Sequence, residues 1–187
     1  VEQNTDSPQI RELAVNSIRN IDPDALQVPA AELFLDLAES YYYHSDALAP
    51  GDEAVDFANI WFYAGNERLL STEEVSKEYF CELMSMRCCE WALRADPDTG
   101  PAISLWLAAF FKAESTGLPQ PEYFGEQHAD ALTYATTAGP EYLHRALARA
   151  VRDNNSYIAL GLVEALATPA GEKSLMYRLG TEQPLIE

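Results

Sequence analysis

Residues 100–114 read GPAISLWLAAFFKAE, and this stretch decides what kind of fold the chain adopts. Pro101 suits the first turn of a helix, because the amide hydrogen that proline lacks would have no partner there. From Ile103 to Phe111, apolar side chains point to almost every side of a helix with about 3.6 residues per turn. A helix that is apolar all round lies at the centre of its domain. The sequence therefore predicts a buried central helix with the other elements packed around it.

Further helices are predicted on both sides of this segment. The chain has 27 Ala and 22 Leu but only 7 Val and 7 Ile, a composition that favours helix over sheet. Between breaks at Pro and Gly, apolar residues recur at intervals of three and four. The predicted helices number eight or so and cover residues 8–22, 30–44, 52–64, 71–95, 100–111, 121–138, 140–153 and 156–167, with another turn or two at 172–178. No strand pattern of comparable strength is present, so we expect an all-α fold with short loops.

Length and charge exclude several classes of protein. A chain of 187 residues is long enough for one domain with a substantial core. It has 12 Lys and Arg against 30 Asp and Glu, a formal net charge of −18 at pH 7. Such a surface repels phosphate groups, which argues against nucleic-acid binding and against polybasic attachment to a membrane. No apolar run is long enough for membrane insertion, so we expect a soluble protein.

The compartment stays open at this point. The chain begins at Val1 and not at Met, so export after removal of a leader is an alternative. The three cysteines, Cys81, Cys88 and Cys89, fall in one predicted helix, where their spacing does not suit a disulfide. No other Cys or His is close enough in sequence to complete a metal site. We therefore expect three buried thiols.

Two segments share a spacing of aromatic and small residues. The pattern aromatic-x2-L-[GA]-x2-aromatic is matched by Phe34, Leu37, Ala38 and Tyr41. A second copy, with apolar substitutions, consists of Ile103, Trp106, Leu107 and Phe110. The copies are separated by about two periods of about 34 residues. Just before the second copy, the positions that close such a unit hold Ser85, Cys89, Ala92 and Pro97. Residues 31–115 thus resemble tetratricopeptide repeats, although Leu107 replaces a small residue and the unit between the copies carries an insertion.

The C-terminal part of the chain resembles HEAT repeats instead. The HEAT spacing D-x4-V-R-x2-A-x2-A-L is matched by Asp153, Ile158, Leu162, Ala165 and Leu166, and the preceding helix supplies Leu143, Leu147 and Val151. Ala159 stands where HEAT repeats carry an arginine, so the ladder of Asp and Arg between neighbouring units cannot form at this position. The break at Pro140 recurs at Pro184, within the HEAT period of about 40–47 residues.

These resemblances imply a single domain built as an α-solenoid of antiparallel helix pairs. It would be tetratricopeptide-like over residues 1–120 and HEAT-like over residues 121–187, with the last repeat truncated, and would form the N-terminal part of a longer bacterial repeat protein. Helix pairs in such arrays cover one another, because one pair cannot bury its apolar stripe alone. An array ending after Glu187 would leave the pair at 140–167 uncovered. We expect either a homodimer contact or an exposed apolar patch on this C-terminal face.

Catalytic sequence signatures are absent, so the sequence predicts no enzyme and no cofactor. Glu141 and His144 have the i, i+3 spacing with which a helix supplies two ligands to a di-iron site. That site needs a second such pair, but neither His44 nor His128 has a Glu three residues before it. A glutamate stabilised by the helix dipole is the simpler interpretation. A helical-bundle, metal-dependent enzyme that uses Glu141 and His144 is the alternative function.

Two charged groups are candidates for surface roles. Glu126, His128 and Asp130 are interpreted as a solvated face, because their spacing puts the histidine on a different side from the acids. A basic stripe is formed at helical spacing by Arg145, Arg149 and Arg152. The simpler interpretation is an exposed face or a bridge to acidic neighbours, and the functional one is a docking site for an acidic or phosphorylated partner.

The tetratricopeptide resemblance also implies a groove for a partner. Its lining would come from Glu39, Tyr42 and Tyr43 in one unit and from Phe111 and Lys112 in the other. Tyr41, Tyr42 and Tyr43 cannot all point inward on a helix, so at least one tyrosine should reach the surface. Exposed aromatic rings suit peptide binding, although simple packing at the rim explains them equally well. The predicted function is a non-enzymatic helical-repeat scaffold or protein–protein interaction domain, whose partner is another protein or the chain's own downstream repeats.

Overall fold

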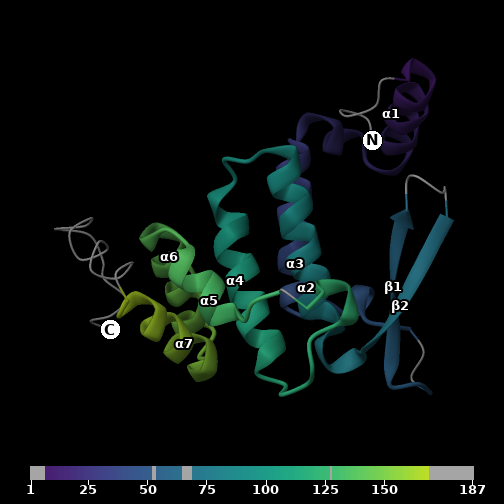
Figure 1. Cartoon of the computed structure of the whole chain (residues 1–187). Coiled ribbons are helices and arrows are strands. Elements are labelled where there is room, and N and C mark those ends of the chain that lie inside the picture. Colours follow the sequence, from purple (N-terminus) through teal and green to yellow (C-terminus); the bar gives the residue numbers. More distant parts are fainter. Residues whose placement is uncertain (1–6, 52–53, 65–68, 127, 169–187) are drawn as a thin grey trace.

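The computed structural model describes residues 7–51, 54–64, 69–126 and 128–168 (Figure 1). The helical turns expected at 172–178 and the repeat expected from Pro184 lie outside the described residues. The helices are α1 (Pro8–Ile21), α2 (Ala30–Tyr42), α3 (Lys77–Ala95), α4 (Gly100–Glu114), α5 (Ala131–Thr137), α6 (Pro140–Arg152) and α7 (Ser156–Leu166). Two strands, β1 (Phe57–Ala64) and β2 (Leu69–Ser76), and three short 3-10 helices, η1 (Pro23–Gln27), η2 (Asp46–Leu48) and η3 (Glu122–Phe124), complete the order. The fold is mostly helical, as predicted.

Helix α4 lies at the centre of the helical body. It packs against α3 on one side and against α5, α6 and α7 on the other, as Figure 1 shows. Nine of its residues are buried, which confirms the predicted central helix. Helix α7 comes so close to α4 that a Cβ atom at Gly161 would overlap the ring of Phe111. Glycine at this position therefore permits the contact between the two helices.

Helix α3 packs against α2 through small side chains. Ala38 of α2 and Cys88, Cys89 and Ala92 of α3 are fully buried. The Ser85 hydroxyl donates a hydrogen bond of 2.9 Å to the carbonyl oxygen of Ala38, which joins the two helices inside the core. All three cysteines are buried free thiols, as predicted.

The helix predicted at residues 52–64 is wrong, because the chain forms a β-hairpin between α2 and α3. Residues 52–64 were expected to be helical, but β1 pairs antiparallel with β2, and Ile60 lies opposite Glu73. Along β1 the side chains alternate: Ile60 is 1% exposed and Trp61 is 58% exposed. Alternation with a period of two buries one face of a strand. The apolar residues of this aromatic-rich segment fit the strand period of two as well as the helical period of 3.6. Pairing with β2 stabilises the strand.

The start of the next helix was also predicted wrongly. The segment from Ser71 to Glu74 has the composition of a helix N-terminus, yet it lies within β2. The helix begins at Lys77, and Ser76 is its cap, because the Ser76 hydroxyl accepts a hydrogen bond of 3.2 Å from the amide of Glu78. A capping pattern stabilises a helix by only about 1 kcal/mol, so strand pairing overrides it.

The predicted helix at 121–138 is divided into two parts. Residues 122–124 form η3, and Gly125 has a φ of 78°, a left-handed conformation that ends the turn. Helix α5 starts only at Ala131, where the side chain of Asp130 accepts a hydrogen bond of 2.8 Å from the amide of Thr133. This hydrogen bonding lowers the pKa of Asp130. The boundaries of α1, α2, α6 and α7 agree with the prediction to within about two residues.

Two apolar faces of the structure are exposed. Helix α1 packs against η1 and has no buried residue, so its apolar side chains face solvent in part, with Leu13 and Ile21 exposed. On the last helix pair, α6 and α7, Leu160 is 70% exposed, and Val151, Tyr157 and Val163 are exposed with it. This agrees with the exposed patch expected there, and the homodimer stays a prediction. None of the described helices is long and apolar enough to cross a bilayer.

Candidate functional site

Six of the eight predicted partner-binding residues lie together where α2, α4 and α6 meet. We call this group the polar seam, and it consists of Glu39, Tyr42, Tyr43, Lys112, Arg149 and Arg152. Whether the polar seam is an open binding surface depends on two properties of its residues: whether their hydrogen-bonding groups already have partners within the molecule, and how far their side chains are exposed.

Arg149 bridges α6 and α2. Both terminal nitrogens of its guanidinium donate to the carboxylate of Glu39, one of them over 2.6 Å, which is the paired geometry of a strong ion pair. Arg149 also donates to the Tyr43 hydroxyl at 3.0 Å, and Arg152 donates to the same oxygen at 2.7 Å. That hydroxyl in turn donates to Asp153 at 3.0 Å. The interpretation of the basic stripe as a bridge to acidic neighbours is confirmed for Arg149.

The inner members of the seam have little or partial access to solvent, and the Lys112 side chain is 25% exposed. Tyr42 is buried, and burial raises the pKa of its hydroxyl well above the usual value. Lys112 lies 4.7 Å from the centre of the Tyr42 ring and donates a hydrogen bond of 2.7 Å to the Tyr42 carbonyl oxygen. Tyr43 is 50% exposed, which confirms that one tyrosine reaches the surface, but both lone pairs and the proton of its hydroxyl are used within the molecule.

The two remaining predicted residues lie apart from the seam. Phe111 is buried in the core against Gly161, and Arg145 is exposed on α6, near Gly100. The structure therefore brings together most of the residues that the tetratricopeptide resemblance implied. It places them in a contact between helices, where they bind one another.

A buried carboxylate that the sequence analysis missed adjoins the seam. The side chain of Glu82 on α3 is 3% exposed, and its Oε1 atom lies 2.5 Å from Nε2 of His44 and 3.1 Å from Nζ of Lys112. Lys112 Nζ is also 3.0 Å from the same histidine nitrogen. Nε2 cannot donate to Glu82 and accept from Lys112 at once, so the histidine tautomer decides which of these two contacts is a hydrogen bond. The cluster holds the turn after α2, where His44 has a φ of 53°.

The metal-binding alternative gains no ligands from the tertiary structure. Within the described residues, no group of three or more His, Cys, Asp or Glu residues is close enough to hold an ion. Glu141 and His144 are therefore not part of such a group in that part of the chain.

His128 does not belong to a solvated face, so this interpretation is wrong for the histidine. Its imidazole stacks on the ring of Phe124 with 3.9 Å between ring centres, and the rings of Phe110 and Tyr134 lie within 5.3 Å. Glu126 and Asp130 are exposed, as predicted. The break at Gly125 turns His128 toward the core, which helical spacing through residues 126–130 could not predict.

An open cleft lies between the hairpin and α3, on a surface that the sequence analysis did not single out. We call it the hairpin cleft. It encloses about 290 Å³ and is lined by Phe62, Tyr63, Leu83, Met86, Arg87, Glu90, Trp91, Arg94, Tyr123 and Phe124. One wall comes from β1, the floor and opposite wall from α3, and the end from η3. The signal that could have found it is the alternation of Ala58, Ile60 and Phe62, which marks a strand whose buried side must face another element.

The walls of the hairpin cleft are held in place by specific contacts. The carboxylate of Glu73 on β2 accepts a hydrogen bond of 3.2 Å from the amide of Tyr123, which joins the hairpin to η3. The rings of Phe62 and Tyr123 are 5.0 Å apart. The guanidinium carbon of Arg87 lies 4.6 Å from the centre of the Phe62 ring and 5.2 Å from that of Trp91, so Arg87 joins β1 to α3. The cleft is therefore formed before any ligand arrives.

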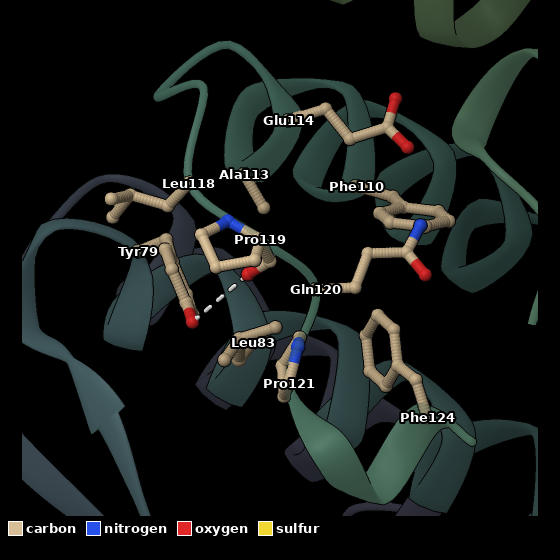
Figure 2. Close-up of a pocket in the computed structure, with 10 residues that line it drawn as sticks. All are labelled: Tyr79, Leu83, Phe110, Ala113, Glu114, Leu118, Pro119, Gln120, Pro121 and Phe124. Atoms are coloured by element: carbon tan, nitrogen blue, oxygen red, sulfur yellow. Dashed lines mark hydrogen bonds between the residues drawn. The ribbon is translucent and has the colours of Figure 1, made fainter. Parts of the chain in front are cut away.

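A second hollow is too small for a ligand. Figure 2 shows it under the loop that follows α4, where Tyr79, Pro119 and Phe124 approach one another. It holds about 20 Å³, which is about the space for one water molecule. The Tyr79 hydroxyl donates to the carbonyl oxygen of Pro119 at 3.3 Å and closes one side. The hairpin cleft is thus the better candidate for binding.

Comparison of the chain with protein-family models, with curated proteins and with solved structures finds no match.

Proposed function

We propose that this chain is a non-enzymatic protein–protein interaction domain that binds a segment of another protein in the hairpin cleft. The observation that carries the proposal is a cleft in which the rings of Phe62 and Trp91 lie against an arginine, Arg87, that has no acidic partner among the described residues. Aromatic residues and arginine are enriched where proteins bind one another, and few catalytic or metal-binding groups accompany them here.

The size of the cleft supports a peptide as its occupant. A volume of about 290 Å³ is at the lower limit for pockets that enclose a small molecule, but it accommodates one or two side chains of a longer segment. Tyr63, which lines the cleft, is 66% exposed, so its ring is available to a bound segment. Each strand of a two-stranded sheet also has one edge without a neighbouring strand, which is a known mode of peptide binding.

We also propose that the helices are stacked pairs of a tetratricopeptide-like and then HEAT-like solenoid. In support, consecutive helices pack side by side, α2 with α3, α3 with α4, and α6 with α7. The hairpin would be the insertion in the second unit, since it lies between α2 and α3. In such an array the chain's own downstream repeats would extend the stack from α6 and α7. The hairpin lies on the other side of α4 in Figure 1, so these repeats would leave it uncovered.

Site-specific photo-crosslinking tests the interaction proposal. A benzophenone amino acid is introduced at Tyr63, which lines the cleft, and separately at Ala148, which is exposed on α6. Each protein is irradiated in cells of the organism that encodes it, and adducts are identified by mass spectrometry. We expect a discrete protein adduct from position 63 that is absent from position 148. Identical adducts at both positions, or none at position 63, would contradict the proposal.

A further inference from the structure

We infer that the hairpin cleft recognises an acidic side chain flanked by an apolar one, and that Arg87 pairs with the carboxylate. This inference rests on the proposed function and names the chemistry of the bound segment. It is argued from the contacts of Arg87, from the distribution of charge in the chain and from the apolar part of the cleft lining.

Arg87 is positioned by contacts that leave its hydrogen-bond donors available. The guanidinium lies over the rings of Phe62 and Trp91, and such cation–π contacts use the faces of the rings and not the N–H groups. In the part of the chain that the structure describes, no acidic oxygen is within 4.0 Å of Arg87, and its guanidinium makes no hydrogen bond. Five donors in a fixed plane match the two oxygens of a carboxylate.

The positioned guanidinium also lowers the entropic cost of binding. A free arginine side chain loses rotamer entropy when it is immobilised. Here the two rings restrict the side chain before a ligand arrives, so less freedom is lost when the carboxylate binds. Glu73 and Tyr123 hold the wall that carries Phe62, which keeps this arrangement in the free protein.

The cationic residues of the cleft differ from those of the polar seam in whether they have an acidic partner. Arg149, Arg152 and Lys112 all have acidic partners within 4.0 Å. Arg94, which also lines the cleft, has none among the described residues. Glu90 is the acidic residue of the cleft lining, and its carboxylate accepts a hydrogen bond of 3.3 Å from the Trp106 indole. The cleft thus presents two arginines without an acidic partner in the described structure, in a chain of net charge −18.

The apolar part of the cleft lining calls for an apolar neighbour beside the acid. Leu83 and Met86 in the lining are each only 2% exposed, so the surface that a ligand could cover belongs to the half-buried rings of Phe62, Trp91 and Phe124. A carboxylate alone would leave these rings in water, whereas an adjacent aromatic or aliphatic side chain would remove them from it. A nucleic acid would bring many more negative charges against the acidic surface, so a short acidic peptide fits the overall charge better.

Peptide selection tests the inference. A phage-displayed library of random peptides is selected on the wild-type protein and on three variants: Arg87→Gln, Arg87→Lys and Arg145→Gln. Arg145 is an exposed arginine on α6, away from the cleft, and is the matched control. We expect wild type and Arg145→Gln to enrich Asp or Glu next to an aromatic or aliphatic residue. Arg87→Gln should lose the acid preference, and Arg87→Lys should keep it with weaker binding, because lysine keeps the charge but loses the planar pair of donors.

A synthetic peptide from the wild-type selection provides the affinity measurement. Replacement of its acid by the matching amide should weaken binding to wild type about tenfold, which is the loss of one charge-assisted pair, and should hardly change binding to Arg87→Gln. Thermal unfolding checks that each variant is folded. Selected peptides without an acid preference would overturn the inference and leave the peptide-binding proposal intact. If no peptide is selected and crosslinking at position 63 also fails, the proposed function fails as well.

Discussion

At the scale of single residues, the cysteines show how burial determines chemistry. Cys88 and Cys89 are fully buried between α2 and α3. Removal from water disfavours the thiolate, so burial raises the pKa of Cys88 to about 12 and raises the pKa of Cys81 and Cys89 as well. A neutral thiol is a weak nucleophile and a poor metal ligand. These residues therefore fill space in the core.

The raised pKa values predict a loss of stability in alkaline solution. In the unfolded chain a thiol ionises at a pKa of about 8.5, whereas the folded protein keeps it neutral until about pH 12. The stabilising effect is complete below about pH 8.5 and is lost as the pH rises toward the folded value. We expect the free energy of unfolding to fall by about 2 kcal/mol for each fully buried thiol between pH 8.5 and about pH 10.

Urea denaturation at a series of pH values measures this loss. A variant with Cys88→Ala and Cys89→Ala is the control. Tyrosines with raised pKa values also make the free energy of unfolding fall as the pH rises, and the variant retains these tyrosines. The variant should lose less stability than wild type over the same range. Rapid reaction of native protein with a thiol reagent near pH 8 would show that the thiols are not buried.

At the scale of secondary-structure elements, the hairpin differs most from what local pattern suggests. Strand β1 is rich in aromatic residues, which favour strands, but its apolar residues are also dense enough to resemble one face of a helix. Pairing with β2 resolves the ambiguity, since Ala58 and Val75 lie opposite each other on the buried face. The exposed face carries Trp61 and Tyr63. An isolated two-stranded hairpin is only marginally stable, so packing on α3 and η3 supports it.

Neighbouring substitutions in β1 test its register. Ile60→Ala should reduce the free energy of unfolding by about 2–4 kcal/mol, because Ile60 is only 1% exposed and the substitution removes most of a buried side chain. Trp61→Ala, one residue further on, should cost less than about 1 kcal/mol, because that side chain points to solvent. Denaturant unfolding of both variants gives the comparison. Equal losses at the two positions would be incompatible with the observed strand register.

At the scale of the whole molecule, the described residues divide into a packed body and a peripheral helix. Helices α2–α7 share one hydrophobic core, to which β1 and β2 contribute Ile60 and Val75. Helix α1 contributes no residue to that core and lies away from the body in Figure 1. Its apolar residues are largely exposed, so burial within the described structure supplies little of its stability.

A variant that lacks residues 1–21 should therefore be nearly as stable as the full chain. We expect the free energies of unfolding to agree to within about 0.5–1 kcal/mol, since no buried contact is lost. Leu162→Ala is the comparison within the body, because Leu162 is fully buried in α7, and it should cost about 2–5 kcal/mol. Calorimetry of the three proteins provides the test. A loss in the truncated variant as large as that of Leu162→Ala would mean that α1 packs on the body in solution.

The candidate sites differ in how far sequence could predict them. Glu39 was singled out by the tetratricopeptide resemblance and Arg149 by helical spacing, but their ion pair joins residues 110 positions apart in the chain. Glu82 shows no signal in the sequence, because acids on helices usually face solvent, and its burial depends on His44 and Lys112 from other elements. The sequence analysis missed the hairpin cleft because it predicted a helix at residues 52–64, where the structure has β1, one of the elements that line the cleft.

The sequence alone determined the helices that carry a strong 3.6-residue period and clear end signals, the central position of α4 and the burial of the three thiols. These features follow from interactions between residues that are near one another in the chain. The spacing of apolar residues in the sequence therefore indicates them. The strand pairing, the polar seam and the hairpin cleft were decided only by the tertiary structure. They depend on contacts between distant residues, whose free energies outweigh local preferences of about 1 kcal/mol or less for each residue.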